Sequence, residues 1–115
     1  MKLPNAEKAV VDLTKLSNYS LNPNHPEGKH KARVFRSVGL GRNDAERLRQ
    51  LILEAILVAE ATEEEPTDYG RRFVVDFMFR IDEEFKFVLS LIKIRTAWII
   101  RNDEDFPRLT SCFIP

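Results

Sequence analysis

Apolar side chains recur with helical spacing between residues 29 and 38. Ala32, Phe35 and Val38 are three residues apart, so they share one side of a helix. Lys29 and Arg33 fall on another side, where they form a row of cations. We therefore predict an amphipathic helix over 29–38.

A second and longer helical pattern begins near Asn43. Asn43 and Glu46 have the three-residue spacing of a capping box, in which two side chains satisfy the free amides of the first turn. Apolar residues then follow at helical spacing: Leu48, Leu51, Ile52, Ala55, Ile56 and Ala59. Leu57 and Val58 add apolar surface on the opposite side. We predict a helix that runs to about residue 59. Other parts of the fold are expected to cover its second half on nearly all sides.

From Arg71 onward the period changes from that of a helix to that of a strand. Alternate residues share one apolar face, which we expect to lie against the long helix: Phe73, Val75, Phe77 and Phe79. The preceding segment, 63–70, is acidic and contains a proline and a glycine. We read that segment as a polar break between helix and sheet.

The remaining chain predicts further strands. Residues 81–84 form a plausible hairpin connection. The stretch 85–101 is β-branched and aromatic for 17 residues, whereas a strand usually has about 5 or 6, so we expect it to bend, bulge or divide into two strands. A turn is predicted over 102–107 and a final strand over 108–114.

At the start of the chain, Thr14 can cap a brief helix that runs to about Tyr19. Two prolines make 22–28 an irregular loop. Helical periods come first and strand periods last, which predicts the α+β class. We expect two or three N-terminal helices packed on one face of a C-terminal antiparallel sheet of three to five strands, in a single domain, 1–115.

Composition narrows the class of function only slightly. Lys plus Arg and Asp plus Glu each number 18, so no overall field attracts nucleic acid or a membrane. The single cysteine, Cys112, excludes a disulfide framework, and no spacing typical of a metal site is present. No apolar run has the length of a signal peptide or a membrane span. We therefore expect a cytosolic domain with no membrane partner, no metal and no cofactor.

The charge is unevenly distributed. Between Glu27 and Gln50 there are seven Lys or Arg against three acidic residues, whereas 60–68 is acidic with no base. Both histidines, His25 and His30, lie near the start of the basic stretch. Cations beside an imidazole are what binding or cutting a phosphodiester requires. The alternative is an ordinary solvated helix face.

Each candidate residue also has a structural interpretation. His25 lies in the proline-stiffened loop and is either a catalytic group or a turn histidine that bonds a nearby carbonyl. His30 precedes Val34 by one helical turn and can simply pack over it. Lys31 precedes Phe35 by four residues, so its stem follows the apolar side and its ammonium either reaches solvent or enters a cleft.

The last two strands carry a second set of donors. Thr96 precedes Arg108 and Thr110 of the final strand, and antiparallel pairing would group them into a hydroxyl and guanidinium cluster. Such donors suit a phosphate, but they are also what a half-solvated strand face contains. Cys112 sits between apolar neighbours, as a buried structural thiol does.

Several blocks of this chain resemble a bacterial family of small proteins catalogued as a domain of unknown function. These blocks are Asn22-Pro23-Asn24-His25-Pro26, Gly28-Lys29-His30-Lys31-Ala32-Arg33-Val34-Phe35, Thr96-Ala97-Trp98-Ile99-Ile100 and Pro107-Arg108-Leu109-Thr110-Ser111. Similar blocks occur in the C-terminal domains of polymorphic contact-dependent toxins. The order of helices and sheet is similar to the metal-independent ribonuclease fold shared by barnase, EndoU, colicin and RelE toxins.

The resemblance implies a role for each candidate. His25 or His30 would be the acid or base, and Lys31 the cation that stabilises the phosphate. Thr96, Arg108 and Thr110 would be substrate contacts on the sheet. Apart from the resemblance, the cationic helix side makes Lys29 and Arg33 further candidates for substrate binding.

Two functions follow as expectations. The first is a metal-independent ribonuclease-like or toxin-like domain that acts on RNA. The alternative is a noncatalytic interaction module, such as an antitoxin or immunity-like partner, that pairs with a cognate protein through a sheet edge. The long apolar stretch over 85–94 also predicts a homodimer.

Overall fold

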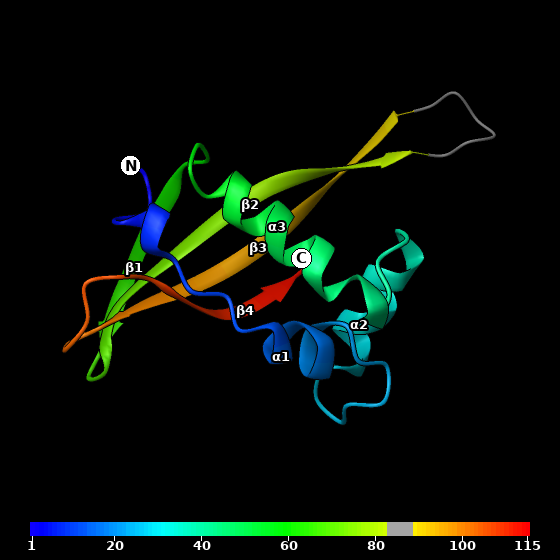
Figure 1. Ribbon diagram of the computed structural model, residues 1–115, viewed down its shortest axis with the longest axis horizontal. Helices are drawn as coiled ribbons and strands as arrows, with labels where there is room; N and C mark the ends of the chain where they lie inside the picture. Colours follow the sequence, from blue (N-terminus) through cyan, green and yellow to red (C-terminus); the bar gives the residue numbers. More distant parts are fainter. Residues whose placement is uncertain (83–88) are drawn as a thin grey trace.

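The computed structural model describes residues 1–82 and 89–115 and has the predicted α+β architecture (Figure 1). Helical elements come first in the chain: η1 (Ala6–Lys8), α1 (Leu13–Lys15), the π-helix η2 (Leu16–Ser20), α2 (Lys29–Ser37), η3 (Arg42–Asp44) and α3 (Ala45–Ala55). The strands follow: β1 (Ala61–Thr67), β2 (Gly70–Asp82), β3 (Leu89–Arg101) and β4 (Arg108–Phe113). They form one antiparallel sheet in the order β1-β2-β3-β4.

The centre of the sheet is the long β2–β3 ladder. Its register runs without a shift from Gly70 opposite Arg101 to Asp82 opposite Leu89. The prediction that 85–101 bulges or divides into two strands is therefore wrong for 89–101, because that segment pairs with β2 in one continuous register. Residues 81 and 82 of the predicted 81–84 connection belong to β2 instead, because they continue its pairing with β3. Residues 83–88 lie outside the described residues.

The predicted polar break is instead largely a strand, β1. Ala61–Thr67 pairs with β2, and the register shifts between Glu64 and Thr67, where Pro66 lies. An edge strand tolerates proline and charge because only one of its sides is paired. Glu63 and Glu64 also face arginines of β2, with closest N–O distances of 2.9 and 3.7 Å. The pattern of apolar residues could not predict this strand, because backbone pairing and cross-strand ion pairs with β2 stabilise it.

Helix α3 covers one face of the sheet (Figure 1). On that face Phe73, Val75 and Phe79 are buried and Phe77 is partly buried, which confirms the predicted apolar face of β2. Trp98 of β3 lies among them with 1% of its surface exposed. Its Nε1 donates to the Thr96 hydroxyl at 2.8 Å. Full burial of each large side chain stabilises the fold by about 1.5–3 kcal/mol.

Helix α3 is shorter than its apolar pattern predicted. It ends at Ala55, and Leu57 and Val58 lie in the following turn with 53% and 71% of their surfaces exposed. The prediction of a helix covered nearly all round is therefore wrong. At the other end, Asp44 rather than Glu46 accepts a backbone bond, from the Gly41 amide at 2.8 Å, so the helix start has shifted.

The first helical segments lie beside the β4 edge of the sheet (Figure 1). Asp12, not Thr14, caps α1, since its carboxylate accepts from the Thr14 amide and hydroxyl at 2.9 and 2.7 Å. The helix then continues as the π-helix η2, which has wider turns and ends at Ser20. Helix α2 matches the predicted 29–38 helix to within one residue and buries Ala32 and Phe35.

One glycine brings α2 close to η2. The Gly28 backbone lies directly against the carbonyl of Tyr19, and a Cβ at Gly28 would overlap that oxygen. Its φ of −89° is ordinary for any residue, so the close approach alone requires glycine here. This contact sets the distance between the two helical elements that flank β4.

Candidate functional site

A cleft of about 240 Å³ opens where η2, α2 and β4 meet. The surface facing it is largely apolar, although several of the residues that line it carry polar groups: Lys15, Tyr19, Ser20, Lys31, Leu109, Thr110, Ser111 and Cys112. Strand β4 is an edge strand, and a short parallel bridge from Val10 to Arg108 covers only its beginning. The cleft begins where this cover ends.

Lys31 is the central charge of the cleft. Its Nζ lies 5.1 Å from the ring centroid of Tyr19 and 4.9 Å from that of Phe113. Both rings attract the ammonium through their negative faces. Within the described residues, no carboxylate oxygen lies within 4.0 Å of Nζ. The ammonium is thus held in place while its charge remains uncompensated.

His25 also contacts Tyr19. The two rings meet edge to face, with centroids 4.7 Å apart and planes at 67°. Nδ1 of His25 accepts the backbone amides of Glu27 and Gly28, each at 3.0 Å. These bonds assign the proton of the neutral ring to Nε2. His25 therefore organises the start of α2 as a turn histidine, but its ring accepts from backbone amides and does not bond the predicted carbonyl; Nε2 presents a donor.

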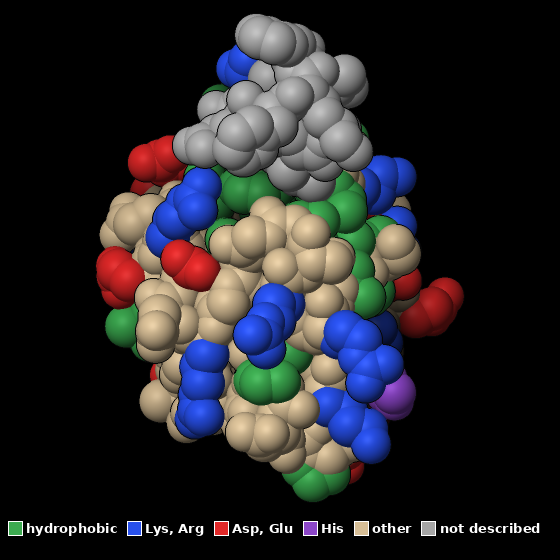
Figure 2. Space-filling model, turned by 90° about the vertical axis from the view of Figure 1, so that its right-hand side faces the viewer, with side chains coloured by type: hydrophobic (Ala, Val, Ile, Leu, Met, Phe, Trp, Pro, Cys, Tyr) green, Lys and Arg blue, Asp and Glu red, His purple; other side chains and the backbone are tan. Residues whose placement is uncertain are grey.

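The other predicted residues of α2 point to solvent. Lys29, His30 and Arg33 are all exposed, and the described part of the chain contains no ion pair to either cation. Figure 2 looks onto this end of the molecule and shows Lys and Arg side chains spread across it beside a histidine. The positive charge of this face is therefore largely uncompensated.

Five arginines of the sheet differ from these helix cations because each has a carboxylate within 4.0 Å. The pairs are Arg71–Glu63, Arg72–Glu64, Arg95–Asp76, Arg101–Glu104 and Arg108–Glu104. Their charge is mostly neutralised inside the fold. A local excess of positive charge thus remains around α2, although the chain as a whole is neutral.

The structure separates the three predicted sheet contacts. Thr110 lines the cleft with Lys31. Arg108 lies in a neighbouring cleft, with its guanidinium bound to Glu104 at 2.8 and 2.7 Å. Thr96 is fully buried, and its hydroxyl donates to the Val75 carbonyl while accepting from Trp98. Thr96 therefore faces the core, because it lies on the helix-covered side of β3.

Cys112 borders the cleft but is almost fully buried. Burial raises the pKa of its thiol to about 12, and the nearby Lys31 charge opposes only part of that rise. The thiol is therefore protonated at neutral pH and is not an activated nucleophile. Within residues 1–82 and 89–115, no group of three His, Cys, Asp or Glu side chains is placed to hold a metal ion. No described helix is long and apolar enough to cross a bilayer.

Sequence reasoning missed Lys15, Tyr19 and Ser20 as members of the site. All three lie in or next to the π-helix, where five-residue hydrogen bonding replaces the ordinary helical spacing. Single-turn π segments often occur at functional sites. The apolar pattern contains no signal for this widening, so only the structure shows which side chains it turns toward β4.

The Arg108–Glu104 pair makes stability depend on pH. The hydrogen bond from Arg108 is the main cause that lowers the pKa of Glu104 below its ordinary value of 4.5, and the charges of Arg108 and Arg101 add to it. A carboxylate with a depressed folded-state pKa stabilises the fold above the unfolded pKa and loses that contribution as pH falls through the folded value. We expect Tm to fall as the pH is lowered from about 5 toward 3.

The variant Glu104→Gln isolates this contribution. At pH 7 it should melt below the wild type, and the two melting temperatures should converge as the pH falls, because both side chains are then neutral. Circular dichroism melts at several pH values would measure this. A constant difference between the two proteins across the range would contradict the assignment.

Comparison with known proteins gives a family but no described relative. One family model matches residues 2–115, and its description is Domain of unknown function (DUF6883). No curated protein and no solved structure matches the chain. The predicted membership in a family of unknown function is confirmed. The resemblance to polymorphic toxins and ribonucleases stays a prediction.

Proposed function

Since the chain belongs to the DUF6883 family, whose description names no activity, we propose a function from the cleft itself: a metal-independent, toxin-like ribonuclease that acts in the cytosol. One observation carries the proposal. The Lys31 ammonium, uncompensated within the described residues, lies in a cleft whose walls carry the hydroxyls of Tyr19, Thr110 and Ser111.

This combination suits the backbone of RNA. An ammonium and several hydroxyl donors can bind the non-bridging oxygens of a phosphodiester, and charge-assisted hydrogen bonds of this kind are stronger than neutral ones. The unpaired cations of α2 lie at the same end of the molecule and would steer a polyanion toward the cleft. Tyr19 and Phe113 add aromatic faces on which bases can stack.

Cleavage requires one proton to move between two oxygens. The ribose 2′-oxygen forms a bond to phosphorus while the bond from phosphorus to the 5′-oxygen breaks. The proton that leaves the 2′-hydroxyl reaches the 5′-oxygen by way of a histidine, which acts first as base and then as acid. Lys31 stabilises the additional negative charge on the phosphoryl oxygens during this step.

Neither histidine lines the cleft: His25 contacts its wall residue Tyr19, and His30, the residue next to Lys31, points to solvent. Hydrogen bonding leaves His30 the freer ring to carry the proton. Nδ1 of His25 is already occupied by two backbone amides, so that ring would break both bonds in order to accept a proton there. His30 is exposed, and its ring takes part in none of the hydrogen bonds within the described residues. His25 would then serve as a donor that positions the phosphate.

The decisive experiment is incubation of purified protein with total RNA in excess EDTA. Wild type should cleave the RNA, and Lys31→Ala should lower the rate by roughly 10²-fold or more, the usual effect of losing one electrostatic donor. Lys93→Ala, an exposed lysine on the far part of β3, is the matched control and should retain activity. Intact RNA after incubation with wild type would show that the nuclease proposal is wrong.

Two histidine variants separate the roles. His30→Ala should abolish cleavage without lowering Tm. His25→Asn keeps an acceptor for the amides that begin α2, since asparagine is a good helix cap, and so keeps the fold while it removes the ring. Loss of cleavage in His25→Asn alone would instead assign proton transfer to His25.

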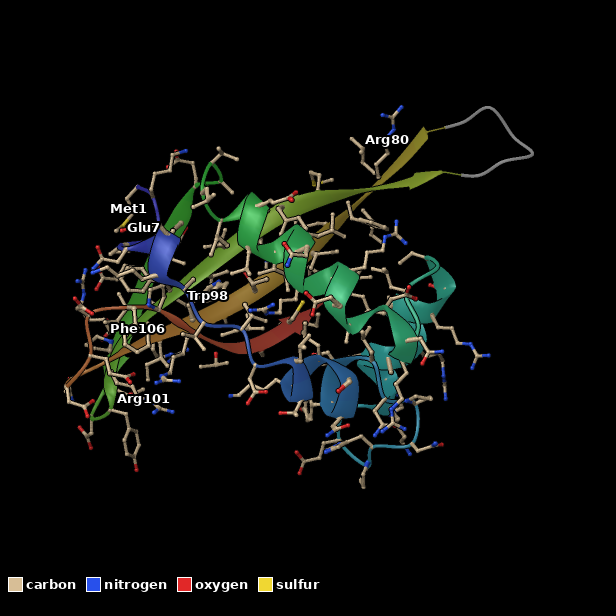
Figure 3. All side chains as sticks on the ribbon, viewed as in Figure 1. Met1, Glu7, Arg80, Trp98, Arg101 and Phe106 are labelled. Carbon is tan, nitrogen blue, oxygen red and sulfur yellow. The ribbon has the colours of Figure 1, made fainter. Side chains whose placement is uncertain are left out.

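A second candidate function, protein interaction, is favoured by a projecting β-arm. The pairing of β1 with β2 ends at Val75, and that of β4 with β3 ends at Arg95. Beyond these points the described residues of β2 and β3 pair only with each other (Figure 1). Figure 3 shows Arg80 out on this arm, whereas Trp98 lies in the body of the sheet. Both edges of the arm therefore present unpaired backbone groups.

We propose a second copy of the chain as the occupant of this arm. Met78 and Leu91 are 54% and 62% exposed there. Antiparallel pairing of two β2 edges about Met78 would place Asp76 of one copy opposite Arg80 of the other, so the charges are complementary. A two-stranded arm is only marginally stable alone, and pairing with the arm of a second copy would stabilise it by making a four-stranded sheet.

Solution mass tests this second candidate. Light scattering should give twice the chain mass for wild type and the single mass for Met78→Asp, which would place two carboxylates face to face. Val58→Asp is the matched control because Val58 is an exposed apolar residue away from the arm. A monomeric wild type would refute self-pairing.

A further inference from the structure

The cleft around Lys31 has a second cleft next to it. This neighbouring cleft, of about 140 Å³, is lined by Val10, Asp12, Lys15, Ile99, Arg101, Arg108, Leu109 and Thr110. Lys15, Leu109 and Thr110 belong to both clefts. Leu109 is buried, so the exposed groups of the shared wall are an ammonium and a hydroxyl. The two clefts therefore lie next to each other beside β4, the second being the more polar, and we refer to them together as the β4 path.

Thr110 reaches this path because β4 bulges. Leu109 pairs with Trp98 and Ser111 pairs with Ala97, which leaves Thr110 as the extra residue between them. A bulge turns the side chain away from the regular alternation and often occurs near functional sites.

Both clefts contain positive groups, and the second also contains the carboxylate of Asp12. Lys31 lies in the first cleft, Lys15 on the shared wall, and Arg108 in the second cleft. Two N–H groups of Arg108 donate to the Glu104 carboxylate. A guanidinium has about five N–H groups, so the remaining ones can donate to a second acceptor.

We propose that the second cleft binds the phosphate next to the one held by Lys31. The ligand is then single-stranded RNA with at least two consecutive phosphates, whose backbone runs along β4. Unpaired bases fit the structure because Tyr19 and Phe113 flank Lys31 with partly exposed rings. This inference rests on the proposed function, since it assumes that Lys31 holds a phosphate of RNA.

Binding of short, uncleavable ligands tests the inference. The probes are 2′-O-methyl oligouridylates with one phosphate or with five phosphates, fluorescently labelled and measured by anisotropy in EDTA. Wild type should bind the longer probe more tightly. Lys15→Gln and Arg108→Gln should each weaken binding of the longer probe about tenfold, with little change for the one-phosphate probe.

Salt dependence gives a second readout. Each phosphate contact in a single strand adds about 0.7 to the slope of log affinity against log salt, so Lys15→Gln should lower that slope by about this amount for the longer probe. Lys93→Gln is the matched control and should lower neither affinity nor slope, because Lys93 lies in neither cleft.

The outcomes separate this inference from the proposed function. If wild type binds the probes and Lys31→Gln weakens both, but Lys15→Gln and Arg108→Gln weaken neither, the second phosphate site is refuted and the first survives. If wild type binds neither probe, both proposals fail together. If it binds only the duplex form of the longer probe, the single-stranded assignment is refuted.

Discussion

Replacement of Trp98 with alanine should lower the free energy of unfolding by about 3–5 kcal/mol, the usual cost of removing a large buried aromatic side chain. Trp98 is 1% exposed and lies opposite Phe73 and Leu109 on the strands at either side. Its removal leaves a cavity between α3 and the sheet. Urea unfolding followed by circular dichroism would measure the loss.

Trp98→Phe is the control that separates volume from hydrogen bonding. It keeps most of the ring volume but removes the N–H that donates to Thr96. The Thr96 hydroxyl still donates to the Val75 carbonyl at 2.7 Å, so the additional cost should be about 1 kcal/mol. A loss in Trp98→Ala no larger than in Trp98→Phe would show that this region relaxes to fill the space.

Gly28→Ala should disturb the site and the fold together. The new Cβ would overlap the Tyr19 carbonyl, so α2 must move away from η2. Overpacking of this kind costs about 1–3 kcal/mol. The displacement would also separate His25 and Lys31 from the Tyr19 ring, and RNA cleavage should fall with it. Proton NMR provides an independent readout, because loss of the edge-to-face contact should shift the His25 ring signals.

Gly39→Ala is the matched control at the other end of α2. Gly39 has a φ of +89° with open space around the position of a Cβ, so alanine there is strained but collides with nothing. It should lower stability by about 1–2 kcal/mol through backbone strain while cleavage and the His25 signals are retained. Wild-type cleavage and an unchanged His25 spectrum in Gly28→Ala would contradict the proposed role of the close approach.

The elements that sequence reasoning predicted well are those whose own periodicity decides their structure. Helix α2 and strand β2 begin within one residue of the predicted positions, and β4 begins at Arg108 as predicted. Each has an apolar face that a single neighbouring layer can bury. Errors occurred where a partner decided the outcome, as in β1, which is a strand because β2 pairs with it.

The candidate site divides in the same way. His25 and Lys31 could be selected from residue type and local context, and both contact Tyr19 in the structure. The sequence could not show which of the three predicted sheet residues, Thr96, Arg108 and Thr110, face the cleft. The bulge in β4 and the twofold alternation of β3 decide that Thr110 faces the cleft and Thr96 faces the core.

The sequence by itself determined the α+β class, the order of helices before strands, and the concentration of positive charge around α2. These properties depend on residue type and on spacings of two to four positions, which act within one element. Only the tertiary structure decided that η2, α2 and β4 enclose one cleft. Tyr19 and Thr110 are 91 positions apart in the chain, and no local period records which distant residues meet when long-range strand pairing closes the intervening loops.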